Sequence, residues 1–495
     1  MLRLVLPIVT VAALGVAALL GSAGEAAPYA SAKPNVVFIL ADDVGYGDLG
    51  CYGALKVRTP NIDRLAAQGL RFTDAHSASA VCTPSRYALL TGQYAWRNPA
   101  GDHILPGNAA LSIKPGTLTL PALLKAAGYR TAAVGKWHLG LGDTAPDWNM
   151  DIKPGPLEVG FDECFIIPAT GDRTPCVFVE NHRIHGYDPK DPIAVDYKNC
   201  VPGHSNPVAG IGRIGAMTGG TAALWKDEEI ADTLTARAVA FIERNKTVPF
   251  FLYLATHDIH VPRMPAARFR GSSQAGVRGD VIQQFDACVG EVLKTLDRHK
   301  LANNTVVFVT SDNGGILDHG DLPERDGDVR SNNGHAFNGA LRGTKGTPYE
   351  GGTRVPLVVR WPGKVKPGTS DELVCLVDVL ATCAALTGQP LSGEAGPDSF
   401  DMLPVLLGQK QDKPVRDNLI EHSRRMGVRQ GQWKLIIRAD ARQPTKGGKV
   451  NSSAELYNLA EDLGETNDLA RKYPEKVKEL AVLWERLRTK GCSRP

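Results

Sequence analysis

Alternation of buried strands with helices is the feature that most constrains the fold of this chain. Continuous apolar runs rich in β-branched residues are typical of strands that are covered on both faces of a parallel sheet. Helical patterns such as "TPNIDRLAAQG" and "TLPALLKAAGY" separate these runs. The runs are "NVVFIL" (35–40), "RTAAVGKWHLG" (130–140), "FFLYLATH" (250–257), "TVVFVTSDNGG" (305–315) and "VPLVVRWPG" (355–363). We therefore expect an α/β fold with a mostly parallel sheet flanked by helices.

Two changes of pattern divide the chain of 495 residues. From Asp371 onward, a helix "VDVLATCAALTG" leads to a strand "QWKLIIRA" and a final amphipathic helix "PEKVKELAVLWERLRTK". We expect a larger domain over 34–370 and a smaller α+β domain over 371–495. Residues 165–220 are rich in Gly, Pro, His and Asn and have little periodicity, which predicts a long irregular insertion.

The N-terminus predicts export. Residues 1–27, "MLRLVLPIVTVAALGVAALLGSAGEAA", have one early arginine, a long apolar run and then small residues, as a cleaved signal peptide does. The alternative is a permanent membrane anchor, but no basic stop-transfer cluster follows the run, so no stable anchor is expected. The net charge of +3, without a basic run, gives no support to nucleic-acid binding. We expect a secreted or periplasmic protein.

An exported chain can form disulfides, so its nine cysteines need an interpretation. Nine is odd, so at least one cysteine is left over or serves another purpose. Cys176 and Cys200 flank an irregular stretch and could pair, and Cys82 is the candidate for the unpaired one.

Cys82 stands at the entrance of a short helix in "VCTPSRYALLTG". Thr83 is the expected N-cap, Pro84 suits the first helical position, and Gly92 ends the helix. The positive end of the helix dipole would stabilise a thiolate or another anionic group there. The alternative is a cysteine that packs as a small buried hydrophobe.

Polar residues recur where the predicted strands end, at 42–43, 136–138, 257–260 and 312–313. Ligands of open α/β sheets bind beyond the carboxyl ends of the strands. Asp42, Asp43, Asp312 and Asn313 offer oxygen ligands, which fit a hard cation, Ca²⁺ or Mg²⁺, better than zinc.

Cationic groups near the same ends predict a binding site for a tetrahedral oxyanion. Arg86 follows Cys82 by one helical turn, and Lys136 and His138, two apart on a strand, should project to the same side. The full set is Arg86, Lys136, His138, His260 and Lys345.

"CTPSR…LLTG" resembles the motif of the sulfatase family, in which the cysteine is oxidised to Cα-formylglycine. The resemblance runs from Pro34 into the C-terminal domain and leaves only 171–220 without a counterpart. It rests further on "NVVFILADDVGYGDLGCYG", "YRTAAVGKWHLG", "FFLYLATHDIHVPRMP", "FVTSDNGG", "LRGTKGTPYEGGTRVPLVVRWPG" and "ELYNLAEDLGETNDLA". It implies an alkaline-phosphatase-like fold, a catalytic 34–370 domain and maturation of Cys82 by a formylglycine-generating enzyme.

The resemblance also implies roles for the candidate residues. The aldehyde hydrate of residue 82, activated by the cation and by Asp312 as base, attacks sulfur, and its second hydroxyl, deprotonated with help from His138, later releases sulfate. His260 or Lys345 protonates the leaving alcohol, while Arg86 and Lys136 orient the diol. Residue 82 is also a cation ligand. Thr170, His257 and His335 are candidate substrate contacts.

The expected function is therefore an exported sulfatase that acts on carbohydrate or aryl sulfates, with one Ca²⁺ or Mg²⁺ ion. The alternative within the same superfamily is a phosphodiesterase or phosphonate hydrolase. A second alternative is a binding protein that never matures its cysteine, although a full catalytic set has no use in a mere binder.

Overall fold

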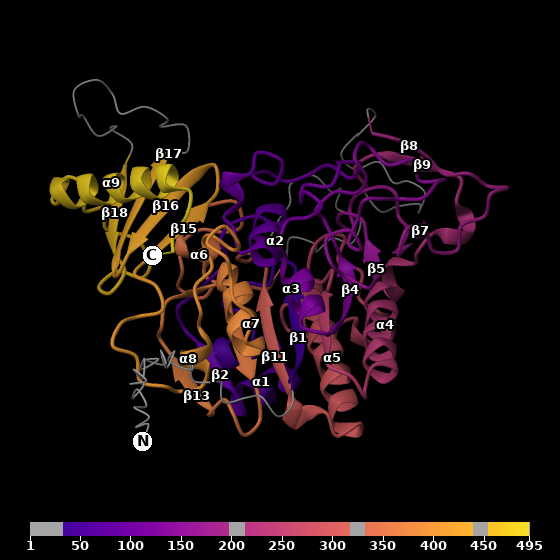
Figure 1. Ribbon diagram of the computed structural model, residues 1–495, viewed down its shortest axis with the longest axis horizontal. Coiled ribbons are helices and arrows are strands. Elements are labelled where there is room, and N and C mark those ends of the chain that lie inside the picture. The colour runs from indigo at the N-terminus through magenta and orange to yellow at the C-terminus, as the bar shows by residue number, and fades with distance from the viewer. Residues whose placement is uncertain (1–32, 198–212, 317–331, 439–453, 495) are drawn as a thin grey trace, which may run out of the picture.

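A computed structural model describes residues 33–197, 213–316, 332–438 and 454–494. A ten-stranded mixed sheet forms the centre of the molecule (Figure 1), with the strand order β13-β2-β12-β11-β1-β10-β4-β5-β6-β7. Strands β11, β1, β10, β4 and β5 run parallel to one another, while β12 is antiparallel to β11. The predicted α/β fold with a mostly parallel sheet is confirmed. The bounds are β1 Asn35–Ala41, β2 Leu70–Phe72, β4 Arg130–Lys136, β5 Glu163–Ile167, β6 Val179–Glu180, β7 Arg183–Ile184, β10 Phe250–Ala255, β11 Thr305–Ser311, β12 Leu357–Arg360 and β13 Gly368–Ser370.

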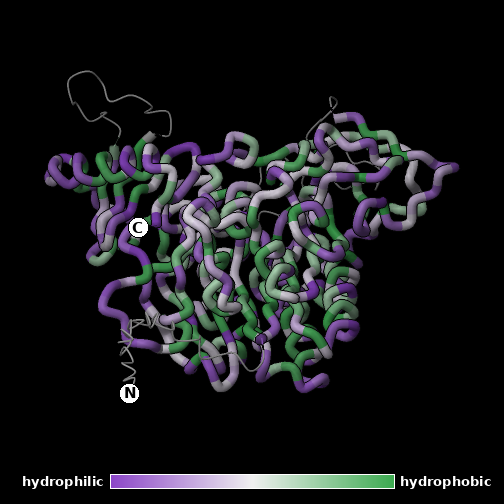
Figure 2. The backbone as a smooth tube through the Cα atoms, in the orientation of Figure 1, coloured by the Kyte–Doolittle hydropathy of each residue, from purple (hydrophilic) through white to green (hydrophobic). Residues whose placement is uncertain are grey.

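Helices cover both faces of this sheet, which explains its continuous apolar strands. In β1, Val36, Phe38 and Leu40 join one core, while the alternate residues Val37 and Ile39 join the other. Figure 2 shows the strands as the most hydrophobic part of the chain, with polar loops outside them. The helices α2 Cys82–Thr91, α3 Leu120–Ala126, α7 Val379–Thr387 and α8 Leu403–Leu406 pack on the first core, and α1 Pro60–Ala67, α4 Ile230–Arg244 and α5 Gly276–Arg298 on the second.

A small antiparallel sheet lies at the C-terminal end of the chain (Figure 1). Its strands are β15 Asn418–His422, β16 Arg425–Gln430, β17 Trp433–Arg438 and β18 Glu455–Asn458, and α9 Pro474–Lys490 covers it. Short elements complete the fold: β3 Ala75–His76 pairs with β14 Val374–Cys375, β8 Ala194–Asp196 pairs with β9 Ala216–Thr218, and α6 spans Glu350–Thr353. The stretch 165–220 is therefore less irregular than expected, since it supplies part of β5 and four further strands.

Two local predictions around α2 and β4 are wrong. Helix α2 begins at Cys82 with Val81 as its N-cap, so Thr83 is helical, and its hydroxyl donates to the carbonyl of His138 at 2.9 Å. His138 lies beyond the end of β4 with a φ of 54°, so strand alternation does not relate it to Lys136. The predicted end of α2 is confirmed, because Gly92 is the C-cap in the left-handed conformation.

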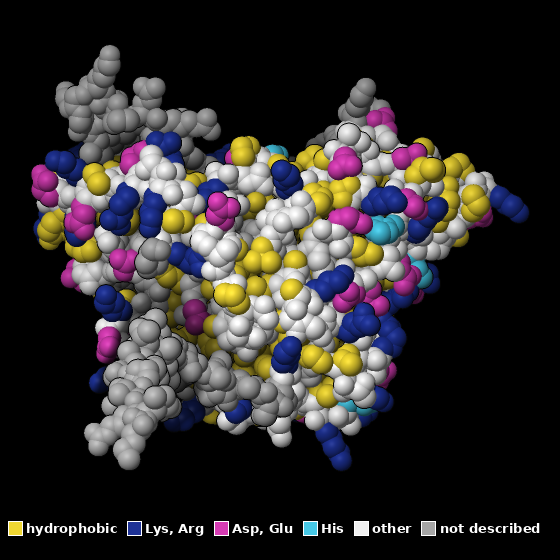
Figure 3. Space-filling view, in the orientation of Figure 1, with side chains coloured by type: hydrophobic (Ala, Val, Ile, Leu, Met, Phe, Trp, Pro, Cys, Tyr) yellow, Lys and Arg dark blue, Asp and Glu magenta, His cyan; other side chains and the backbone are white. Residues whose placement is uncertain are grey.

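Two further sequence predictions concern residues that the structure does not describe. The signal peptide and Cys200 lie outside the described residues, so neither export nor the pairing of Cys176 with Cys200 is tested. None of the eight cysteines that are described forms a disulfide. Within the same ranges, no helix combines the length and apolarity needed to cross a bilayer. On the face drawn in Figure 3, acidic and basic side chains are interspersed.

Candidate active site

Strands β11, β1, β10 and β4 are neighbours in the sheet, and three of them end at candidate residues. Asp42 follows β1 directly, Lys136 is the last residue of β4, and Asp312 follows β11. Because these strands are parallel, their carboxyl ends meet at the same edge. The three side chains are fully buried. The strand pattern in the sequence therefore placed these residues correctly.

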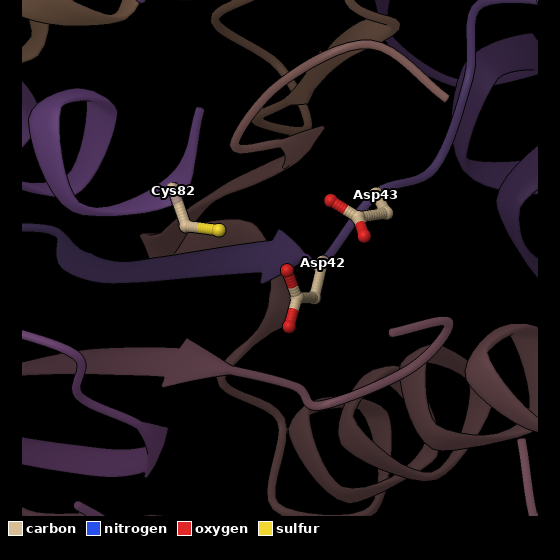
Figure 4. A group of neighbouring side chains, drawn as sticks. All are labelled: Asp42, Asp43 and Cys82. Carbon is tan, nitrogen blue, oxygen red and sulfur yellow. The ribbon is translucent and has the colours of Figure 1, made fainter. Parts of the chain in front are cut away.

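Two carboxylates and the sulfur of Cys82 lie close together at the start of α2. Ligand atoms of Asp42, Asp43 and Cys82 all lie within 4.8 Å of one another, and Figure 4 shows the three side chains gathered at the end of β1. Asn313 Nδ2 donates to Asp43 Oδ1 at 2.8 Å. Asn313 Oδ1 is buried and accepts no hydrogen bond from any described residue. A buried amide oxygen without a donor is costly in an empty site but is a normal ligand of Ca²⁺ or Mg²⁺. The donor set therefore fits a hard cation.

Each carboxylate of this group also faces a cationic side chain. Lys136 Nζ lies 2.7 Å from Asp42 Oδ2, and Lys345 Nζ lies 2.7 Å from Asp43 Oδ1.

Arg86 binds Asp312 Oδ2 through Nε at 2.9 Å and Nη2 at 2.8 Å. Burial lowers the pKa of Lys345, but the negative charges of Asp43, Asp42 and Asp312 together outweigh burial and hold that pKa above its usual value. Lys345 is therefore protonated at neutral pH. Because three cations match three carboxylates, a bound metal ion would supply the net positive charge of the site.

The environment of Cys82 disfavours a thiolate. Its side chain is buried at the first turn of α2, and burial raises the pKa of the thiol despite the opposing charges of Lys136 and Lys345. These two cations do not overcome burial, so the interpretation of Cys82 as a stabilised thiolate is not supported. An uncharged thiol is a poor nucleophile and a poor metal ligand.

Two buried histidines stand in the uncharged form. Burial, together with the positive charge of Lys136, lowers the pKa of His138 well below its usual value. His138 Nε2 lies 2.9 Å from the carbonyl oxygen of Leu105, which assigns the proton to Nε2, and Nδ1 has no hydrogen-bond partner among the described residues. Burial and Lys345 likewise lower the pKa of His260, whose Nδ1 lies 2.9 Å from the carbonyl oxygen of Val261.

The candidate substrate contacts occupy different surroundings. His257 is buried, its Nε2 lies 3.6 Å from Asp258 Oδ1, and its Nδ1 finds no hydrogen bond within the described ranges. The hydroxyl of Thr170 donates to Asp172. His335 Nε2 lies 2.9 Å from Asp48 Oδ1.

Asp48 also binds Arg278, so His335 belongs to a buried ion-pair network. A direct substrate contact of His335 remains a prediction.

Sequence reasoning missed a second buried cluster of charges, which joins the small sheet to the large one. Asp74, His76 and Glu350 could by distance hold a metal ion. However, Arg429 Nη2 lies 2.6 Å from Asp74 Oδ2, and Lys434 Nζ lies 2.8 Å from Glu350 Oε1. Protein cations thus already neutralise these acids. Lys434 occupies an ordinary strand pattern in the sequence, which gives no signal of this role.

Sequence reasoning also missed Asp172 and Arg173, which follow Thr170 in the turn after β5. Arg173 Nη1 donates to Asp172 Oδ1 at 3.1 Å. The only signal in the sequence was their position two to three residues beyond the candidate Thr170.

Comparison with known proteins identifies the family of this chain. The sulfatase family profile matches residues 34–389. N-acetylgalactosamine-6-O-sulfatase of Bacteroides thetaiotaomicron is 46% identical over 486 residues, which cover 93% of this chain and 94% of the relative. Human arylsulfatase A is 34% identical over 482 residues, with 91% and 87% covered.

A solved structure shows the same fold. It comes from a study of glycosaminoglycan metabolism by Bacteroides thetaiotaomicron and is 45% identical in sequence. It superimposes with a TM-score of 0.86 over 93% of this chain and 100% of its own. The chain belongs to the sulfatase family and is a sulfuric ester hydrolase.

Proposed function

We propose that this sulfatase hydrolyses sulfate monoesters of carbohydrates through a Cα-formylglycine formed from Cys82. The sugar substrate is supported by the similarity to an N-acetylgalactosamine-6-O-sulfatase over nearly the whole of both chains. The linkage position that the relative's name specifies is the first one to test.

The observation that carries this proposal is the position of Cys82. Its sulfur lies at the first turn of α2, within 4.8 Å of oxygens of Asp42 and Asp43, and its thiol is uncharged. An unreactive thiol has no catalytic use among these charged groups, which supports Cys82 as the precursor of formylglycine. Once oxidised and hydrated, residue 82 would supply one hydroxyl as the nucleophile and a second for release of the product.

One Ca²⁺ or Mg²⁺ ion would be held by Asp42, Asp43, Asp312 and Asn313 together with the side chain of residue 82. When bound, such an ion stabilises negative charge on sulfate oxygens and lowers the pKa of a hydroxyl that it contacts. The amide oxygen of Asn313, buried without a donor among the described residues, supports this assignment.

Different side chains around residue 82 orient the nucleophile, accept protons and donate them. Arg86 and Lys136 orient the nucleophile, and Asp312, held by Arg86, is the base that activates it. His138 carries a lone pair on Nδ1 and accepts the proton when sulfate is released. The leaving alcohol is protonated by Lys345, which is charged in the substrate-free protein, or by His260 after an anion raises its pKa.

Export and maturation complete the proposal. Residues 1–27 would direct the chain to the periplasm or the exterior, and a formylglycine-generating enzyme would act on the "CTPSR" motif. A sulfated saccharide outside the cell is the partner that these features favour.

Mass spectrometry of the peptide that contains Cys82, combined with activity assays, tests the proposal. In a host that makes formylglycine, this peptide should show the mass of an aldehyde, and Cys82→Ala should lose nearly all turnover of 6-O-sulfated N-acetylgalactosamine. Cys51→Ala is the control, because Cys51 lies outside the site and should keep its thiol mass in the parent protein. Full activity of Cys82→Ala would contradict the proposal.

A further inference from the structure

We propose that Asp172 and Arg173 form a subsite for a ring hydroxyl of the sugar beside the sulfate, and that this pair makes the enzyme selective for carbohydrate over aryl sulfates. The inference rests on the proposed function, because it takes the sulfate to bind at residue 82.

The turn after β5 lies between the two candidate catalytic histidines. On one side, the backbone N–H of His138 donates to the carbonyl of Pro168 at 3.1 Å, in continuation of the β4–β5 pairing. On the other side, a Cβ added at Gly171 would lie 3.4 Å from Pro262 Cδ and 3.6 Å from the carbonyl oxygen of Val261, just after His260. Because Asp172 follows Gly171 in this turn, we place it beside the sulfate-bearing part of a bound substrate.

The two side chains are held together within this turn. Arg173 Nη1 donates to Asp172 Oδ1 at 3.1 Å, and the hydroxyl of Thr170 bonds to both side chains. The backbone is fixed as well, because the N–H of Ile214 donates to the carbonyl of Asp172 at 2.6 Å. The pair is thus preorganised, which lowers the entropy cost of binding a ligand.

The pair is almost buried but keeps an opening to solvent. The side chains of Asp172 and Arg173 are 10% and 16% exposed. Their charges also act on both histidines. Arg173 lowers the pKa of His138, although burial and Lys136 have larger effects in the same direction. Asp172 acts to raise the pKa of His260, against the larger lowering effects of burial and Lys345. These effects agree with a position at the rim of the catalytic group.

The chemistry of the pair matches a hydroxyl group. An ionised carboxylate only accepts hydrogen bonds and a guanidinium only donates them, whereas a hydroxyl does both. One sugar hydroxyl can therefore donate to Asp172 and accept from Arg173. An aryl sulfate without hydroxyls would displace water from Asp172 and Arg173 but offer them no hydrogen bond in return. The two charged groups would then lose hydration without compensation, which disfavours binding of the aryl sulfate.

The test compares two substrates in matched variants. For Asp172→Asn, the ratio of kcat/KM for 6-O-sulfated N-acetylgalactosamine to kcat/KM for 4-nitrophenyl sulfate should fall about ten- to hundredfold, the scale of one lost charged hydrogen bond. Arg173→Lys should lower the same ratio, and it provides the test if Asp172→Asn fails to fold. Arg268→Ala, which breaks an exposed ion pair with Asp232, is the control and should leave the ratio unchanged.

Binding without turnover identifies the hydroxyl. The Cys82→Ser variant is titrated with the sugar sulfate and with its deoxy analogues, each lacking one ring hydroxyl. One analogue should bind about tenfold or more weakly to Cys82→Ser, but not to the double variant that also carries Asp172→Asn. An unchanged substrate ratio in both Asp172→Asn and Arg173→Lys would overturn the subsite alone. Failure of the parent protein to hydrolyse any sulfate ester would instead overturn the proposed function.

Discussion

Lys136 Nζ lies 2.7 Å from Asp42 Oδ2, and neither side chain is exposed to solvent. The two residues come from β4 and from the end of β1, with β10 between these strands. The pair therefore joins the carboxyl ends of non-adjacent strands across the centre of the site. A buried ion pair adds little net stability, but removal of one partner leaves an uncompensated charge.

We expect Lys136→Met to lower the free energy of unfolding by about 3–5 kcal/mol in chelator-treated protein. Asp42 is then left buried with only Arg86, which lies 3.8 Å away and is already paired with Asp312. Urea unfolding measures this loss. The control is Lys125→Met, because Lys125 is 48% exposed and pairs with Asp162 at the surface. It should cost at most about 1 kcal/mol. Equal losses for the two variants would contradict the importance assigned to burial.

Metal removal should destabilise the protein and abolish its activity. Calcium added back to chelated protein should raise Tm, because the ion binds the folded state only, and about 2.7 kcal/mol is expected at a hundred times Kd. Asp43→Asn should greatly reduce this shift. Asp286→Asn removes a buried carboxylate that instead accepts from the N–H of Ile62, so its calcium-dependent shift should persist. Metal analysis that finds two zinc ions in active protein would contradict the single hard cation.

The strand ends were predictable from the sequence because a parallel sheet allows few arrangements. A buried strand that stops at Asp42 and another that stops at Asp312 must bring these residues to one edge. The same logic located Lys136 and the segment from His257 to His260. Lys345 was among the cationic candidates as well, and its contact with Asp43 spans 302 positions of the chain.

Side-chain geometry outside regular strands was beyond such reasoning. His138 adopts a positive φ after β4 ends, which no period of two describes. Thr83 uses its hydroxyl on the carbonyl of His138 instead of capping α2, because tertiary contacts override the local capping preference. Lys434 is buried between Glu421 of the same small sheet and Glu350, which lies 84 positions away in the sequence.

Acid should destabilise the protein through His422. Burial lowers the pKa of His422 from 6.5 to about 4, against a weaker opposing effect of Asp102. Between these two values the unfolded chain binds more protons than the folded one, so stability falls as the pH is lowered from 6.5 to about 4. The total loss is at most about 3 kcal/mol.

Urea unfolding across this pH range, in the wild type and in His422→Gln, isolates the effect because other titrating groups are common to both. The stability of His422→Gln should depend less steeply on pH. His182→Gln is the control, because His182 is 31% exposed and should leave the slope unchanged. Parallel pH profiles for the wild type and His422→Gln would contradict the prediction.

The charge of the site should favour sulfate over phosphate monoesters. Asp42, Asp43 and Asp312 are matched by Lys136, Lys345 and Arg86, so the excess positive charge of the loaded site would be that of the one divalent ion we propose. This suits a monoanionic sulfate ester better than a dianionic phosphate ester. Lys345→Ala should lower kcat/KM for the sulfate ester at least about a hundredfold, the scale for loss of one oxyanion donor. Lys226→Ala, at a surface lysine that pairs with Glu229, should have no such effect. Sulfate and phosphate esters with a common leaving group make the comparison direct, and faster hydrolysis of the phosphate would contradict this account of the site.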